Sequence, residues 1–363
     1  HGRREEDAPS AREDAPPARE DARTAARAAF CRSSRARARA RFLLPAGGMM
    51  TRQRFLYTAL AFLALVGTAG PARAMEGRAW GDIHVQTMDG AIYPFQAAGE
   101  FVASRSTAGD LEVQLRLEST GFSSYVSIAT AVAMRVDTTR ALVALGREPM
   151  LTVDEEPVVL QPGGRLDLPE GGRIDRSEKG YEIYWSDGSS LSIGVGSGHL
   201  NAYLRPSLTR KGTLSGLFGN FNGSALDDVD VTTAVLGQGS PAGLSPGLAE
   251  LARTLLLDEE HGWLVAQETS LFEYKPGQST RTFRKPTPKR EATVAGLPVT
   301  WRRQARAACE GAGVTHPDLL EACIVDVGYT RDESFVETAV AVQARNDSNW
   351  DSERATRVDP GSR

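Results

Sequence analysis

Apolar and polar residues alternate through much of residues 111–205, as they do in β-strands that bury one face. Every second residue between Leu111 and Leu117 is Leu or Val, and the residues between them are Glu, Gln or Arg. Similar alternation is found over residues 126–136. Two further stretches, 181–185 and 191–195, flank Asp187-Gly188, a dipeptide that favours a tight hairpin. The pattern predicts short antiparallel strands, each with one face in a core.

Turns rich in glycine and proline separate these segments, as at Gln161-Pro162-Gly163-Gly164. Many short strands with such turns are typical of an antiparallel β-sandwich, and we predict a mainly β domain over residues 75–232. Residues 233–247 are rich in Gly, Ser and Pro, and are interpreted as a linker.

The apolar spacing becomes helical beyond the linker, and residues 248–345 are predicted to form a small α-helical region. Residues 346–363 are predicted to be a disordered tail. The expected helices and docked segments are an apolar stripe at 248–256, short docked segments at 270–274 and 279–283, and helices over 300–310, from about 317, and over 332–344.

The N-terminal part has two compositions. Residues 1–48 combine repeated Arg-Glu-Asp-Ala-Pro fragments with an Arg-Ala run, too polar to form a core, and are expected to be disordered. Residues 49–74 carry a short basic region, an apolar run and Ala72-Arg73-Ala74, which is the order of a signal peptide cleaved after Ala74. We therefore expect residues 1–48 to be a translated upstream segment and the protein to be secreted or held in the cell envelope. An uncleaved anchor is the alternative.

The charge is divided unequally. Residues 1–74 hold 14 Arg and 7 acidic residues, which leaves 28 basic and 39 acidic residues in 75–363, a net charge of -11. An acidic body argues against a nucleic-acid partner, because phosphates require clustered Lys and Arg. Of three cysteines, Cys309 and Cys323 lie in the expected mature chain and form a reasonable disulfide pair. Two separate buried thiols are the alternative.

Two motifs flank the β-rich region: Trp80-Gly81-Asp82-Ile83-His84 followed by Met88-Asp89-Gly90, and Gly216-Leu217-Phe218-Gly219-Asn220-Phe221-Asn222-Gly223 followed by Asp227-Asp228. Their order and spacing resemble the von Willebrand factor type D domain. The resemblance implies a β-sandwich that serves as a structural or interaction unit.

The second motif, here called the closing loop (residues 216–228), concentrates carboxylate and amide oxygens, the donors that Ca²⁺ prefers. The alternative is a turn that caps itself through Asn and Asp side chains. The resemblance adds the Asp of the first motif, and it implies the calcium ligands Asp89, Asn220, Asn222, Asp227 and Asp228, with the Ser224 carbonyl as a sixth.

The chain departs from the family pattern twice. Phe218 stands where many members have Cys, so apolar packing is expected to replace a disulfide there. Ile83 stands where the first motif has Pro, so the Asp-Pro bond that some members cleave is missing and no self-cleavage at Asp82 is expected. Asp82 and His84 are interpreted as hydrogen-bonding residues at the start of the first strand.

No histidine has metalloprotease spacing, and the Gly194–Gly198 run fits neither a nucleophile elbow nor a dinucleotide-binding loop. We predict no catalytic residue and an exported, non-enzymatic module with a structural or adhesive role. Its partner would be an extracellular protein or glycan, and with two cysteines the chain is expected to be monomeric. The alternative is a secreted carbohydrate-binding protein that uses exposed aromatic residues such as Tyr203 and Tyr184.

Overall fold

The computed structural model describes residues 76–120, 123–225, 227–228, 262–285 and 292–356. Several predictions lie outside these residues: the disordered segment 1–48, the signal peptide 49–74, the linker 233–247, the helical stripe 248–256 and the last part of the tail, 357–363. They stay predictions.

Short antiparallel strands dominate the described residues. They are β1 (Gly77–Trp80), β2 (His84–Gln86), β3 (Ile92–Pro94), β4 (Gly99–Ser106), β5 (Leu111–Thr120), β6 (Ser123–Val136), β7 (Thr139–Ala144), β8 (Leu151–Val153), β9 (Glu156–Val158), β10 (Arg165–Asp167), β11 (Arg173–Ser177), β12 (Gly180–Tyr184), β13 (Ser190–Val195), β14 (Leu200–Arg205) and β15 (Leu214–Ser215).

The helices are fewer and cluster toward the C-terminal end of the described chain. They are η1 (Pro169–Gly171), η2 (Leu208–Arg210), η4 (Gln267–Thr269), α4 (Thr280–Phe283), η5 (Val294–Gly296), α5 (Val299–Gly311), α6 (Pro317–Thr330) and α7 (Ser334–Thr356).

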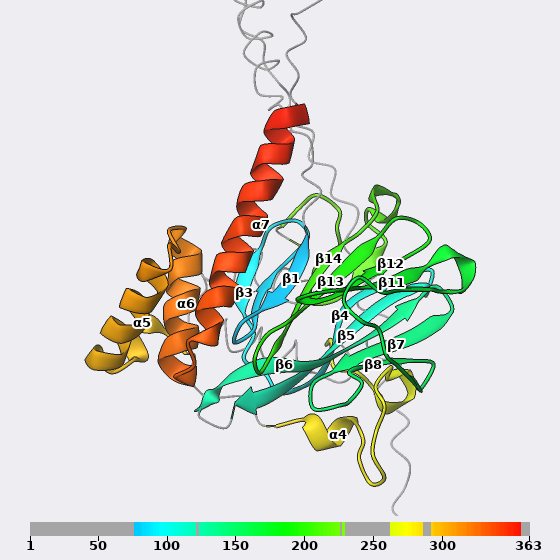
Figure 1. Ribbon diagram of the computed structural model, residues 1–363, viewed down its shortest axis with the longest axis horizontal. Helices are drawn as coiled ribbons and strands as arrows, with labels where there is room; N and C mark the ends of the chain where they lie inside the picture. The colour runs from blue at the N-terminus through cyan, green and yellow to red at the C-terminus, as the bar shows by residue number, and fades with distance from the viewer. Residues whose placement is uncertain (1–75, 121–122, 226, 229–261, 286–291, 357–363) are drawn as a thin grey trace, which may run out of the picture. The chain divides into compact units, whose positions relative to one another are not determined.

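The strands form one hydrogen-bonded sheet that curls around a common core (Figure 1). Its main path runs β10-β11-β12-β13-β14-β6-β5-β4-β15, and two branches leave it, with β1, β2 and β3 continuing from β14 and β7, β8 and β9 from β6. The predicted mainly β, antiparallel fold with a small helical region is confirmed. The layers of the predicted sandwich are connected, because β14 and β6 pair between them.

Strand β5 shows how the core forms. Leu111, Val113, Leu115 and Leu117 are fully buried, as their alternation predicts. Its polar face is buried too, and Gln114 has no exposed surface. The alternation is typical of a strand with one buried face, whereas here a later segment covers the polar face as well.

The covering segment is residues 262–285, which includes both predicted docked stretches. The Gln114 amide donates to the Thr269 carbonyl at 2.9 Å and accepts from the Leu271 N–H at 2.9 Å. The Arg116 guanidinium pairs with Glu100 at 2.7 Å and lies 3.7 Å from the Phe283 ring centroid. Buried polar groups are stable only when hydrogen-bonded or paired, and this segment supplies part of that pairing.

Helices α5 and α6 are joined by the Cys309–Cys323 disulfide, with Cα atoms 6.2 Å apart, so the predicted pair is confirmed. In the chain-entropy model a loop of this size contributes about 3 kcal/mol. Helix α7 does not end at residue 344 but continues to Thr356, into the predicted disordered tail. Nothing in that stretch breaks a helix, since neither Gly nor Pro occurs before Pro360.

The helical region packs on β1 and β14. Trp80 and Tyr203 from these strands join a buried cluster with Cys309, Cys323 and Phe335. Tyr203 is 4% exposed, with the Arg345 guanidinium 4.1 Å from its ring centroid. The prediction that Tyr203 is an exposed aromatic is therefore wrong, because helices that follow the β domain cover it.

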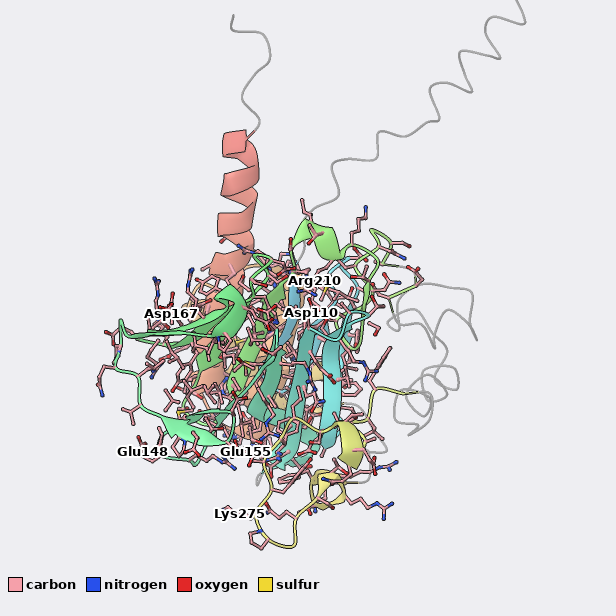
Figure 2. The ribbon with its side chains drawn as sticks, turned by 90° about the vertical axis from the view of Figure 1, so that its right-hand side faces the viewer. Asp110, Glu148, Glu155, Asp167, Arg210 and Lys275 are labelled. Carbon is pink, nitrogen blue, oxygen red and sulfur yellow. A yellow bond between two sulfur atoms is a disulfide. The ribbon has the colours of Figure 1, made fainter. Side chains whose placement is uncertain are left out.

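A charged network joins the β4–β5 turn to η2. The buried Arg210 guanidinium donates to Asp110 at 2.8 and 3.1 Å and to Asp187 at 2.6 Å, and Figure 2 shows Asp110 beside Arg210. Hydrogen bonds from Arg210 lower the pKa of Asp110 to about 2.

We expect Asp110→Asn to destabilise the protein at pH 7 by about 1 kcal/mol. The expected loss is this small because Asp110 is partly exposed and solvent weakens its attraction to Arg210. The folded state favours the carboxylate, so this contribution is complete above the unfolded-state pKa near 4 and is lost as the pH falls toward 2. Urea unfolding at pH 7, 4 and 2.5 measures it, with Asp318→Asn on the exposed surface of α6 as the control. A difference from wild type that is constant with pH would contradict the assignment.

Candidate functional site

The closing loop lies against the hairpin formed by β2 and β3. The Met88 N–H donates to the Phe218 carbonyl at 2.9 Å, and the Tyr93 hydroxyl donates to the Leu217 carbonyl at 2.7 Å. Phe218 is fully buried, and a Cβ on Gly77 would lie only 2.7 Å from it. The expected apolar packing in place of a cysteine is confirmed.

Asp89, in the turn between β2 and β3, connects the two motifs. Its carboxylate accepts the N–H of Asn222 at 2.9 Å and the N–H of Gly223 at 3.0 Å. More than 130 residues separate these partners in sequence. The structure therefore brings the first motif and the closing loop into one site.

Asp227 and Asp228 bind the rest of the loop. Asp227 accepts the side-chain amides of Asn222 at 2.6 Å and Asn220 at 3.2 Å. Asp228 accepts the backbone N–H of Asn220 at 3.1 Å and the hydroxyl of Thr87. The predicted ligands Asp89, Asn220, Asn222, Asp227 and Asp228 all take part in this network. Ser224 takes part through its N–H, which donates to Asn222 Oδ1 at 2.7 Å, and not through the predicted carbonyl.

Burial, together with the neighbouring Asp89 carboxylate, raises the pKa of Asp228 to about 6, although hydrogen bonds from Thr87 and Asn220 act in the opposite direction. Burial would also raise the pKa of Asp227, but the Asn222 and Asn220 amides outweigh it and lower that pKa. Asp227 Oδ1 is buried and has no hydrogen-bond partner among the described residues.

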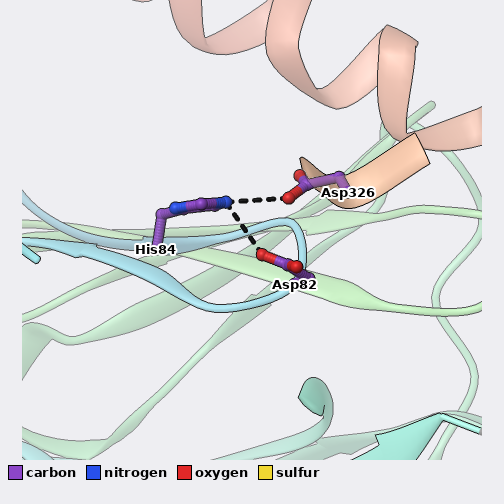
Figure 3. Close-up of side chains that lie close together, drawn as sticks. All are labelled: Asp82, His84 and Asp326. Atoms are coloured by element: carbon purple, nitrogen blue, oxygen red, sulfur yellow. Dashed lines mark hydrogen bonds and ion pairs between the residues drawn. The ribbon is translucent and has the colours of Figure 1, made fainter. Parts of the chain in front are cut away.

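A second cluster involves the first motif and helix α6. His84 Nε2 lies 2.8 Å from Asp82 Oδ1 and 2.7 Å from Asp326 Oδ1 (Figure 3). The predicted hydrogen-bonding role of Asp82 and His84 agrees with these contacts. Asp82 and His84 come from the β1–β2 turn and the start of β2, whereas Asp326 comes from the middle of α6.

Burial and mutual proximity shift the pKa values of Asp82 and His84. Burial raises the pKa of Asp82 well above its usual value, and the nearby Asp326 carboxylate adds to the effect. Burial alone would lower the pKa of His84, but Asp326 and Asp82 outweigh it and raise that pKa well above its usual value. His84 Nε2 thus lies between two acidic side chains that come from different elements.

A family comparison agrees with this geometry. Residues 77–231 match the family model of the von Willebrand factor type D domain. This part of the chain is a type D domain. The match begins at β1 and ends just after the closing loop, so it includes both motifs but not helices α5 to α7.

Type D domains are non-catalytic interaction modules typical of extracellular proteins. Within the described residues, no helix has the length and apolar character needed to cross a membrane.

The closing loop of this type D domain fits Ca²⁺ in its chemistry. Its side-chain donors are carboxylate and amide oxygens, without sulfur or imidazole, and one carboxylate oxygen, Asp227 Oδ1, is buried without a partner. Most other oxygens accept N–H groups of the loop, which is the arrangement of the self-capped turn. The hydrogen bonds of the turn thus hold these oxygen atoms, the potential calcium ligands, in place.

Sequence reasoning missed Asp326. Its neighbours in α6 are apolar, and it is 1% exposed. A carboxylate inside the apolar run Cys323-Ile324-Val325-Asp326-Val327 was the available signal, because buried acids are rare unless paired. Its partners could not be read from the sequence, since Asp82 and His84 lie more than 240 residues away.

Gly219 allows the closing loop to fold around Asp228. Its φ is +82°, and a Cβ there would lie 2.2 Å from Asp228 Oδ1. We expect Gly219→Ala to destabilise the domain by about 2 kcal/mol through strain and overpacking. Urea unfolding of the chain measures this loss.

Gly223→Ala is the matched control, because Gly223 also has positive φ, +99°, but its nearest neighbour is the Lys211 side chain at 3.5 Å. It should cost about 1 kcal/mol from strain alone. Equal losses in the two variants would mean that contact with Asp228 is unimportant.

Proposed function

We propose that this chain is an exported, non-enzymatic interaction module in which Ca²⁺ binds the closing loop and holds it against the β2–β3 hairpin. The ligands would be Asp89, Asn220, Asn222, Asp227 and Asp228, with the Ser224 carbonyl as a sixth. The ion would supply charge neutralisation and fixed geometry, without a role in any reaction.

One observation carries this proposal: Asp89 meets the closing loop, which lies more than 130 residues further along the chain. A turn that only caps itself needs no carboxylate from another hairpin. Here the distant carboxylate of Asp89 accepts two N–H groups of the loop and comes close enough to Asp228 to raise the pKa of that residue.

The electrostatics favour a cation. Asp89 and Asp228 repel each other, and this repulsion contributes to the raised pKa of Asp228. In the part of the chain that the structure describes, no Lys or Arg forms an ion pair with Asp89, Asp227 or Asp228. A divalent cation would replace repulsion with attraction at these carboxylates.

An adhesive or structural role in an extracellular setting follows from the family and from the signal peptide that residues 49–74 are predicted to form. The partner would be an extracellular protein or glycan. Carbohydrate binding through exposed aromatics loses support, because Tyr203 is buried and the Arg173 guanidinium lies 3.9 Å from the ring centroid of Tyr184.

Calorimetric titration of the full chain with Ca²⁺ tests the proposal. We expect one site and a higher melting temperature than in chelator, with a stabilisation of about 2.7 kcal/mol at a free concentration 100 times Kd. Asp89→Asn should abolish both effects, because it removes one of the negative charges that would bind Ca²⁺. Asn is chosen because it has the same size as Asp and keeps one hydrogen-bond acceptor.

Asp175→Asn is the control, since Asp175 pairs with Arg165 at 2.8 Å in β10 and β11, at one end of the main strand path. It should leave the Ca²⁺ isotherm unchanged. If wild type gives neither heat nor a thermal shift, the loop is a self-capped turn and the calcium proposal fails.

A further inference from the structure

Three potential metal ligands converge where α6 meets the β1–β2 turn. Among the described residues, Asp82, His84 and Asp326 are the group of histidine and acidic side chains whose ligand atoms all lie within 4.8 Å of one another. The two carboxylates approach the same imidazole nitrogen from two different elements (Figure 3). This cluster is separate from the closing loop, with which it shares no residue.

The cluster is enclosed by the protein. Asp82 is fully buried, Asp326 is 1% exposed, and both lie within hydrogen-bond distance of one imidazole nitrogen. Asp82 Oδ2 is buried and has no hydrogen-bond partner within the described segments. An unpaired buried carboxylate oxygen is costly, and the native structure is expected to satisfy it.

We propose that Asp82, His84 and Asp326 bind a divalent transition-metal ion of the Zn²⁺ type. A dication with two carboxylates and a neutral imidazole makes a neutral cluster. The ion would take the place of the proton on His84 Nε2 and would also be within reach of the orphaned oxygen of Asp82.

The ligand types select the class of ion. Imidazole nitrogen with carboxylate oxygen suits Zn²⁺ and similar ions, whereas Ca²⁺ and Mg²⁺ prefer oxygen alone. Tetrahedral coordination at about 2.0 to 2.2 Å places ligand atoms roughly 3.3 to 3.6 Å from one another, so the donors must move apart by roughly 0.5 to 0.9 Å from their present 2.7 and 2.8 Å contacts. The fourth position would be filled by Asp82 Oδ2 or by water.

The surrounding residues hold the donors in place. A Cβ on Gly81 would lie 2.2 Å from Asp326 Oδ2, so glycine is needed for the helix carboxylate to approach. The Gln96 amide donates to Asp82 Oδ1 at 3.2 Å and also to the Asp82 carbonyl. Such outer contacts orient metal ligands in proteins. His84 retains 12% side-chain exposure, which gives an ion access.

The site would fasten the helical region to the type D domain. Asp326 lies one turn beyond Cys323, so the helix that carries it is also tied to α5 by the disulfide. A metal bond between α6 and the β1–β2 turn would connect this disulfide-linked pair to the sheet.

Titration of the chelator-treated full chain with Zn²⁺ tests the proposal, with Ca²⁺ in excess so that the closing loop does not compete. We expect a one-site isotherm, a higher melting temperature, and visible absorption of the Co²⁺-substituted protein typical of low coordination number. Asp326→Asn and His84→Gln should each remove the isotherm and the Co²⁺ spectrum.

His316→Gln and Asp318→Asn are matched controls, because both residues are exposed at the start of the same helix. Both should bind Zn²⁺ as wild type does. Circular dichroism without metal checks folding, and His84→Gln decides the matter if Asp326→Asn does not fold. Failure of the wild type to bind Zn²⁺ or Co²⁺, or binding that survives in His84→Gln, would overturn the proposal and leave a hydrogen-bonded Asp-His-Asp contact.

Discussion

The fold depends on the return of residues 217–228 to the first hairpin. A backbone hydrogen bond from Met88 to Phe218 and a hydrogen bond from the Tyr93 hydroxyl to the Leu217 carbonyl join the two ends of the domain, and Phe218 fills the core beside Gly77. Every strand between these ends is thereby enclosed in one curled sheet. With no cysteine in the closing loop, packing and hydrogen bonds alone make this closure, which is why the geometry around Gly219 and Asp228 is so tight.

The same closure concentrates negative charge. Asp89 must enter the closing loop to hold it, and it approaches Asp228, whose pKa is raised by burial and by that proximity. N–H groups of the loop donate a hydrogen bond to each oxygen of Asp89 and so stabilise its negative charge. A bound cation would act on a site that the backbone has already organised, so binding would require little rearrangement.

The regions outside the type D domain change what its surfaces can do. Residues 262–285 cover the polar face of β5, and the C-terminal helices cover Trp80 and Tyr203. Two faces that would be open in an isolated sheet are therefore internal. The helical region also supplies Asp326, which converts the Asp82–His84 pair into a three-residue cluster.

The sequence by itself determined the local elements and most of the closing loop. Alternation at Leu111–Leu117, the Asp187-Gly188 turn and the helix-forming stretches act over a few residues, where periodicity and turn chemistry are decisive. The disulfide could be predicted for the same reason, since its two cysteines are only 14 residues apart in the sequence. Only the tertiary structure decided the burial of Tyr203 and Gln114 and the place of Asp326. Those outcomes depend on which distant segment covers a given face, and alternation along one strand carries no information about what packs on its polar side.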